Sequence, residues 1–269
     1  MTRKPETAEA LYNNRAAVPD HPAVMARWKA SAEAVRREHP PLKLAYGPGA
    51  RETIDLFEAE CPAQGGPVVV FIHGGYWQAL DPSWFSGMAP AFLAHGVGMA
   101  IPAYDLCPDV PLATIVDQMR AAVALIAART GRLPVVSGHS AGGHLAACLL
   151  SEGRAAAAVA ISGVFDLEPL VETSLNTALG LDRETARALS PLHSAVPPGA
   201  VLDCVVGGAE TAAFLDQSRT MADVWGAQGA ATRFQALEGL NHFTVLDPLL
   251  QADSELVGRI VGLSCSSAG

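Results

Sequence analysis

The stretch of sequence that decides the fold is Gly138-His139-Ser140-Ala141-Gly142-Gly143, which directly follows the apolar run Leu133-Pro134-Val135-Val136. Gly-x-Ser-x-Gly between a short strand and a helix of small residues is the pattern of a nucleophile elbow, a strained turn that lifts a serine hydroxyl above a parallel sheet. The serine at this turn has an unfavourable backbone angle, and glycines flank it because side chains there would collide with the adjoining strand and helix. The pattern predicts Ser140 as a nucleophile.

A second motif lies upstream, where His73-Gly74-Gly75-Tyr76-Trp77 follows the buried-strand pattern Val68-Val69-Val70-Phe71-Ile72. Paired glycines at this point let the backbone approach a substrate carbonyl, and their N–H groups can stabilise an oxyanion. We therefore expect an oxyanion hole from Gly74, Gly75 and the N–H of Ala141, with His73 bracing the loop. Tyr76 and Trp77 fit core packing and a substrate-binding wall equally well, and we predict the wall.

Composition limits the classes of protein that the chain can represent. Its 269 residues, half of them hydrophobic, predict one domain spanning residues 1–269. A net charge of −9 argues against nucleic-acid binding, which needs a clustered basic face. Five scattered cysteines without CxxC spacing predict reduced thiols. Met1–Glu6 lacks the apolar core of a secretory signal and no apolar run is long enough for a membrane span, so we expect a cytoplasmic protein with no membrane contact. A homodimer is compatible with the sequence.

Strand and helix patterns alternate along most of the chain, which predicts an α/β fold with an eight-stranded, mostly parallel sheet flanked by helices. Residues 1–40 form a helical polar leader broken by prolines. Residues 166–199 interrupt the alternation and are long enough for a cap over the carboxyl edge of the sheet, where ligands bind in such folds. The expected elements are strands 42–46, 53–57, 68–72, 97–103, 135–136, 156–162, 201–206 and 232–237, of which the first two form an antiparallel edge pair, and helices 83–95, 111–130, 141–151, 211–228 and 245–263.

A nucleophilic serine needs a base, and the base needs an orienting acid, in the chain order Ser, acid, His. His242 lies in a loop after the last expected strand and is the predicted base, whereas His193 lies in the insertion and is the weaker candidate. Glu210 directly follows the strand at 201–206 and the glycines after it, so it is the favoured acid. Asp216, further into the next helix, and Asp166, after the preceding strand, stay open as alternatives.

The residues around the Gly-x-Ser-x-Gly motif match neither a metal-binding motif nor a nucleotide-binding motif. His139 and His144 are five positions apart and lie on different faces of the helix, and HExxH is absent. Gly138 and Gly143 have the spacing of a phosphate loop, but the Lys-Ser/Thr that such a loop requires is missing. We therefore expect no metal and no cofactor.

Taken together, four motifs resemble the α/β-hydrolase fold, and within it the serine-type arylformamidases (kynurenine formamidases): residues 73–77, 138–143, 208–211 and 241–243. HGG is also shared by hormone-sensitive-lipase-like esterases, and the Tyr-Trp pair after it is the more discriminating feature. The segments Tyr12-Asn13-Asn14-Arg15 and Phe214-Leu215-Asp216-Gln217-Ser218 also resemble that group, so the likeness covers nearly the whole chain.

The resemblance implies hydrolysis of a small-molecule substrate with an N-formyl or similar small acyl amide, such as N-formylkynurenine, through an acyl-enzyme. Ser140 would attack, His242 would transfer the proton and Glu210 would orient it; the family often has aspartate at the acid position, so glutamate is a departure. Two alternatives remain: a carboxylesterase acting on short-chain esters, and a non-catalytic relative that binds a ligand or partner. Non-catalytic relatives usually lose the serine or the histidine, and this chain keeps both.

Overall fold

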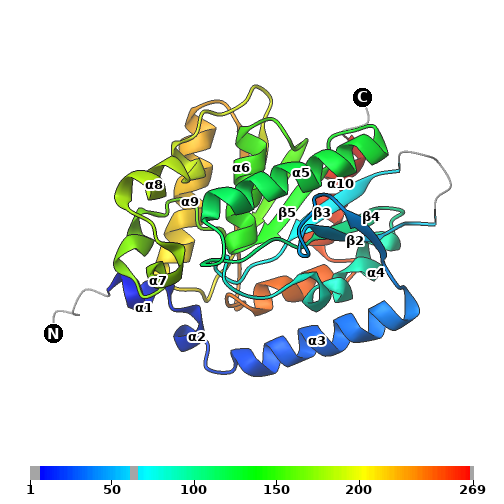
Figure 1. Cartoon of the computed structure of the whole chain (residues 1–269), viewed down its shortest axis with the longest axis horizontal. Helices are drawn as coiled ribbons and strands as arrows, with labels where there is room; N and C mark the ends of the chain where they lie inside the picture. Colours follow the sequence, from blue (N-terminus) through cyan, green and yellow to red (C-terminus); the bar gives the residue numbers. More distant parts are fainter. Residues whose placement is uncertain (1–6, 61–65, 267–269) are drawn as a thin grey trace.

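The computed structural model describes residues 7–60 and 66–266 of the chain. An eight-stranded sheet lies at its centre, in the order β1-β2-β4-β3-β5-β6-β7-β8 (Figure 1). β1 and β2 pair antiparallel, as do β2 and β4, and the strands from β4 to β8 run parallel. This confirms the predicted sheet, including the antiparallel pair at its edge. The strand bounds are β1 Leu42–Ala45, β2 Thr53–Phe57, β3 Val68–Ile72, β4 Gly98–Pro102, β5 Val135–His139, β6 Ala157–Ile161, β7 Val201–Gly207 and β8 Ala231–Leu237.

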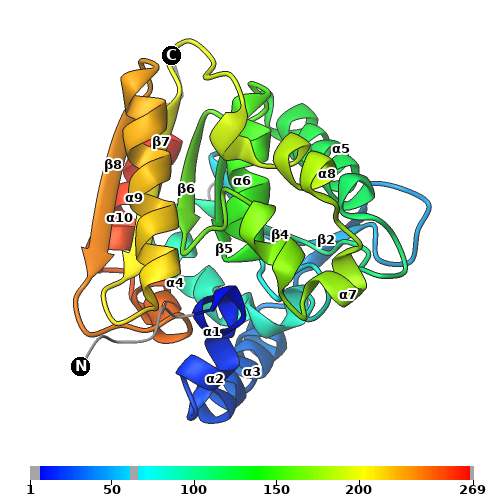
Figure 2. The same ribbon diagram turned by 90° about the vertical axis from the view of Figure 1, so that its left-hand side faces the viewer.

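Helices cover both faces of the sheet (Figures 1 and 2). The α-helices are α1 Ala8–Tyr12, α2 Asn14–Ala17, α3 His21–Glu38, α4 Ala89–Leu93, α5 Leu112–Thr130, α6 Ala141–Ser151, α7 Asn176–Leu179, α8 Arg183–Ala188, α9 Ala212–Ala227 and α10 Glu255–Ser266. Short 3-10 turns are η1 Pro82–Trp84, η2 Ser86–Met88, η3 Glu168–Glu172, η4 Pro191–His193 and η5 Thr244–Leu250. None of the described helices has the length and apolar character needed to cross a membrane.

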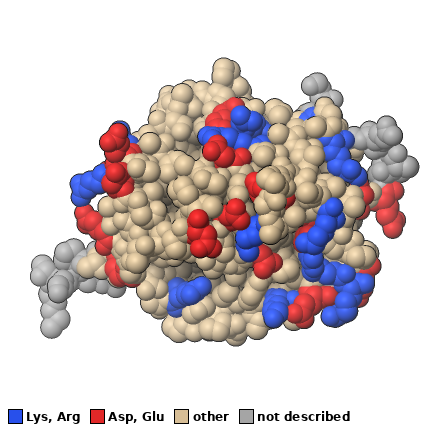
Figure 3. Space-filling view, in the orientation of Figure 1, with Lys and Arg blue, Asp and Glu red and all other residues tan. Residues whose placement is uncertain are grey.

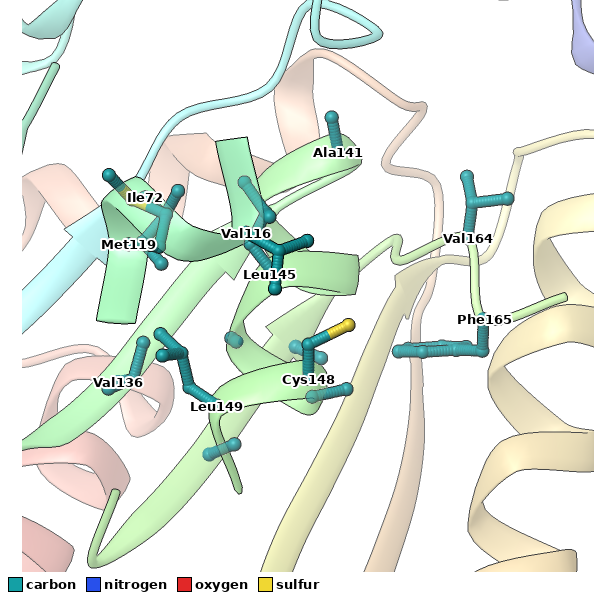
Figure 4. Close-up of a cluster of buried hydrophobic side chains, with 14 of the residues drawn as sticks. Ile72, Val116, Met119, Val136, Ala141, Leu145, Cys148, Leu149, Val164 and Phe165 are labelled. Carbon is teal, nitrogen blue, oxygen red and sulfur yellow. The ribbon is translucent and has the colours of Figure 1, made fainter. Parts of the chain in front are cut away.

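The core divides into two clusters because successive side chains of a strand point to opposite faces of the sheet. In β3, Val70 and Ile72 belong to the cluster packed under α5, α6 and α9, whereas Val69 and Phe71 belong to the cluster under α3, α4 and α10. Figure 4 shows part of the first cluster, including Ile72, Val136, Leu145 and Leu149. Burial on both faces explains why the central strands are apolar throughout.

The last predicted helix differs from the structure. The range 245–263 was expected to be one helix, but it consists of η5 and, after a break, α10. Pro248 lies inside η5 and lacks the backbone N–H that a continuous α-helix would use. The expectation was wrong because the apolar periodicity continues across the break while the backbone hydrogen bonds do not.

The predicted helix at 83–95 is also wrong over its first half, where η1 and η2 precede the short helix α4. Gly87 lies against α3, since a Cβ on it would be 2.5 Å from Ser31 Oγ. This close approach, together with Pro90 in the first turn of α4, favours short turns over a single helix. In the leader, Pro22 does not break α3, because it lies in the first turn, where its missing N–H costs nothing.

Charged side chains of both signs lie next to one another on the face in Figure 3. The buried side chain of Asp55 forms ion pairs with Arg36 at 2.5 Å and with Lys43 at 3.1 Å. Arg120 likewise pairs with Glu152. The basic residues of these segments are thus largely compensated by acidic ones, which is the pattern of a solvated surface.

Candidate active site

Ser140 lies at the turn between β5 and α6. Its φ of 55° and ψ of −115° place a non-glycine residue in an unfavourable backbone region, as the motif predicts. Its N–H donates to Ile161 O at 2.8 Å, which ties the turn to the end of β6. The residue is only 2 % exposed, yet it lines a pocket.

Two glycines make this turn possible. A Cβ on Gly138 would lie 2.1 Å from Gly142 O, and a Cβ on Gly142 would lie 1.9 Å from Ile72 O. Neither contact can be relieved by a side-chain movement, because both partners are backbone atoms. The elbow therefore packs directly on the end of β3.

His242 lies in the loop after β8, and its Nδ1 is 2.6 Å from Glu210 Oε2. Asn241 shapes this loop, since its Oδ1 accepts from the N–H groups of Phe243 and Thr244. Both side chains of the pair are shielded from water: Glu210 is fully buried, and 6 % of the His242 side chain is exposed. The structure thus brings the predicted acid and base together, and both His242 and Ser140 line the same pocket. In the described part of the chain, no hydrogen bond joins Ser140 to His242.

His139 connects the elbow to the His242 loop. Its Nε2 is 2.8 Å from His242 O, and because a carbonyl oxygen only accepts, Nε2 carries the proton. Burial, and then the neighbouring His242, hold the pKa of His139 well below its usual value, so the ring is neutral. His139, which lies between Gly138 and Ser140 in the motif, therefore holds the backbone carbonyl of His242.

Ser162 is a polar residue at this site that sequence reasoning missed. Its Oγ donates to Glu210 Oε1 at 2.5 Å, and the N–H of Gly207 donates to the same oxygen at 2.7 Å. The two residues are 48 positions apart, and a single serine after a strand carries no recognisable motif. The parallel pairing of β6 with β7 brings them together.

The alternative acids lie elsewhere. Asp166 accepts from the N–H of Glu168, and Asp216, on α9, makes no hydrogen bond to His242 within the described chain. Asp203, buried in β7, binds Arg259 through both of its oxygens. Glu210 is therefore the carboxylate that contacts the histidine.

The glycine loop after β3 lies against the elbow. A Cβ on Gly74 would be 3.1 Å from Ser140 Cβ, and Gly75 has a φ of 109° and lines the pocket. Gly74 and Ala141 do not line it, although Ala141 is the first residue of α6, whose N-terminal N–H groups lack partners within the helix. His73 braces the loop as expected: its Nδ1 is 2.8 Å from Gly74 O, and burial lowers its pKa to about 4.

The two aromatic residues after the glycines have different environments. Tyr76 lines the pocket, and its hydroxyl donates to Tyr12 O at 2.6 Å. Trp77 is fully buried, does not line the pocket, and packs edge-on against the ring of His144. The predicted substrate wall therefore corresponds to the placement of Tyr76 and differs from that of Trp77, whose side chain packs into the core.

The pocket has a volume of about 450 Å³, and the N-terminal segment forms much of its wall. Figure 2 shows α1 at the end of the sheet toward which β8 points. The lining includes the aromatic residues Tyr12, Trp28, Tyr76 and Phe243 and the charged residues Glu9 and Arg15. Residues 12–15 resemble the arylformamidases in sequence, but no pattern in the sequence predicts that they reach the site.

Hydrogen bonds fasten the N-terminal segment over the pocket. Thr211, next to Glu210, donates to Leu11 O at 2.7 Å. Glu9 accepts from both the N–H and the hydroxyl of Ser174, which lies in the insertion, and these hydrogen bonds lower its pKa. Gln78 of the glycine loop donates to Leu175 O in the same insertion at 3.1 Å. The leader and the insertion thus close the pocket from two sides.

A group of potential metal ligands lies away from the pocket. Ligand atoms of Asp166, Glu168 and His193 lie within 4.8 Å of one another. Arg187 already forms an ion pair with Glu168 at 3.2 Å, and none of the three residues lines the pocket. This cluster is therefore no part of the site around Ser140.

Comparison with known proteins agrees with this geometry. Residues 69–187 match the family model described as the alpha/beta hydrolase fold. Kynurenine formamidase of Drosophila melanogaster is 30% identical over 79% of this chain and 78% of its own, and that of Salmo salar is 28% identical over 83% and 82%. A crystal structure from Silicibacter sp., provisionally described as a thioesterase, has a TM-score of 0.86 at 36% identity and covers 93% of this chain and 97% of its own.

The chain therefore belongs to the α/β-hydrolase family. Within that family it is a hydrolase related to the kynurenine formamidases.

Proposed function

We propose that the protein is a serine hydrolase that cleaves an N-formyl aryl amide such as N-formylkynurenine, with Ser140 as nucleophile, His242 as base and Glu210 as orienting acid. The observation that carries the proposal is the hydrogen bond between Glu210 and His242. His242 lines the same pocket as Ser140, which lies at a turn with a strained backbone. These groups supply an activated nucleophile and an oriented base, which acyl transfer requires.

The reaction proceeds in two steps. Ser140 Oγ attacks the formyl carbon while His242 Nε2 takes its proton, and N–H groups of Gly74, Gly75 and Ala141 stabilise the oxyanion. The C–N bond then breaks as His242 returns the proton to the leaving nitrogen, which releases the aryl amine. Water, deprotonated by His242, attacks the formyl-enzyme, and formate leaves with regeneration of the Ser140 hydroxyl.

The pocket supports an aromatic substrate with charged groups. Tyr12, Trp28 and Phe243 offer aromatic surface to an aryl ring. Arg15 lines the pocket and, within the described chain, has no ion-pair partner, so it is available for a carboxylate such as that of an amino acid. The resemblance to kynurenine formamidases over most of the chain points to the same class of substrate.

The test compares wild type, Ser140→Ala and Ser137→Ala on N-formylkynurenine and p-nitrophenyl acetate. Ser137 is a matched control, since it is buried in β5 three residues before the nucleophile and does not line the pocket. We expect Ser140→Ala to lose more than about a thousandfold in kcat and Ser137→Ala to keep its rate. Turnover of the ester without the formamide would favour an esterase, the second candidate, which the similarity to the Silicibacter protein also supports.

A phosphonate directed at serine hydrolases separates catalysis from a binding role. Stoichiometric labelling that Ser140→Ala abolishes supports the proposal, and failure of the wild type to react would exclude it.

We also propose a cytoplasmic location, and a cap function for residues 166–199. Cys107, Cys148 and Cys204 are buried free thiols, which is compatible with a reducing compartment, whereas Cys61 lies outside the described residues. Ser174 and Leu175 of the insertion line the pocket, so movement of this segment would open it. A homodimer remains a proposal that analytical ultracentrifugation tests.

A further inference from the structure

The carboxylate of Glu210 is held by three donors from three parts of the chain. One oxygen receives the hydroxyl of Ser162 and the N–H of Gly207, and the other receives His242 Nδ1. Its side chain is fully buried, so water cannot replace any of these donors. A buried carboxylate that loses a donor keeps its desolvation cost without compensation.

Ser162 is held rigidly where its hydroxyl meets this carboxylate. It is the first residue after β6, fully buried, and its N–H donates to Val205 O of β7 at 2.7 Å. Its φ of 50° is a region that glycine enters freely and that serine enters at a cost. Since glycine would relieve the backbone strain, the side chain must contribute something that offsets it, and its recorded contact is with Glu210.

We propose that Ser162 is a positioning residue that holds the Glu210 carboxylate in the orientation in which it accepts from His242. This inference rests on the proposed function. The charge-assisted hydrogen bond restricts the carboxylate to one rotamer and shares its negative charge. Ser162 does not line the pocket and therefore acts only through Glu210.

The experiment measures kcat, KM and the pH profile of kcat/KM for Ser162→Gly and Ser162→Ala. Ser162→Gly removes the hydroxyl while suiting the positive φ, so the backbone is not strained further. Ser137→Ala is the matched control, because this buried serine donates to Val159 O on the same strand β6 and not to the catalytic groups. We expect kcat to fall by about tenfold to a hundredfold in both Ser162 variants, with KM unchanged.

The pH profile distinguishes positioning from a structural role. Without the Ser162 donor, the carboxylate attracts the protonated ring of His242 more strongly, so the acid limb of kcat/KM should move to higher pH. The neighbouring titratable side chains His139 and Tyr76 stay neutral in this range because burial lowers the pKa of His139 and raises that of Tyr76. An unchanged profile together with a lowered melting temperature would overturn the proposal.

A double mutant shows whether Ser162 acts through Glu210. In a Glu210→Gln background, Ser162→Gly should cost little further activity, whereas independent losses that multiply would contradict the inference. All rates are measured on both N-formylkynurenine and p-nitrophenyl acetate, together with the rate of phosphonate labelling of Ser140. Slower labelling on removal of Ser162, by a factor similar to the fall in kcat, supports the inference even where the formamide is not a substrate, so its outcome is separate from that of the proposed function.

Discussion

The elbow and the N-terminal wall surround the same pocket, but different forces hold them in place. At the elbow, backbone packs directly on backbone, and the shape depends on glycines that admit no Cβ. The wall, formed by residues 8–17, is fastened to the glycine loop, to Thr211 at the start of α9 and to the insertion by hydrogen bonds that involve side chains. The comparison teaches that the turn carrying Ser140 is set by steric fit over a few ångströms, whereas the N-terminal wall is set by polar contacts between distant segments.

The largest expected effect is the loss of the steric fit at the elbow. Gly142→Ala places a Cβ 1.9 Å from Ile72 O, so we expect destabilisation of more than about 3 kcal/mol and no measurable hydrolysis. Gly258→Ala in α10 is the control, because open space surrounds this glycine and alanine favours the helix by about 1 kcal/mol. Urea unfolding of both variants checks this, and a native-like Gly142→Ala would break the comparison.

A pH effect on stability is expected from α6. Burial lowers the pKa of His144 to about 4, while in the unfolded chain it titrates near 6.5. The unfolded state therefore binds the proton first, and stability falls as the pH drops from about 6.5 toward 4. Between pH 7 and pH 5 the wild type should lose about 2 kcal/mol more than His144→Gln. Urea titrations at both pH values test this. An equal loss of unfolding free energy in wild type and His144→Gln would contradict the lowered pKa of His144.

A smaller effect is expected where the elbow holds the His242 loop. His139→Ala leaves His242 O without its buried donor, so the loop that carries the imidazole loses a contact with the elbow. We expect kcat to fall about tenfold to a hundredfold with little change in KM. His139→Gln keeps an N–H donor and should recover part of the rate. If both variants match the wild type, the loop is held by other contacts.

The smallest effects are expected at the wall. Glu9→Gln weakens an exposed contact with Ser174, so KM should rise only a few-fold while kcat stays constant. Arg15→Gln should raise KM for N-formylkynurenine and leave that for formanilide, which has no carboxylate, unchanged. Steady-state kinetics with both substrates measure the difference. A large fall in kcat in either variant would show that the wall belongs to the reacting machinery.

Local patterns in the sequence were enough to predict most of the sheet and to select the candidate nucleophile, acid and base. Gly-x-Ser-x-Gly after an apolar strand specifies a turn through sterics alone, and the order of Ser140, Glu210 and His242 along the chain follows from the topology of parallel strands. The sequence also ranked Glu210 above Asp166 and Asp216, and the structure pairs Glu210 with His242.

Only the tertiary structure decided the surroundings of those groups. Ser162 meets Glu210 because β6 pairs with β7, residues 8–17 reach the pocket from the far end of the chain, and Trp77 turns into the core beside Tyr76. Pro248 lies inside a 3-10 turn where hydrophobic periodicity alone would have predicted part of a continuous α-helix. Contacts between residues far apart in sequence depend on packing and strand order, and neither leaves a periodic or spaced signal in the residues themselves. The sequence by itself therefore determined the candidate nucleophile, acid and base, and the tertiary structure determined their support and the shape of the pocket.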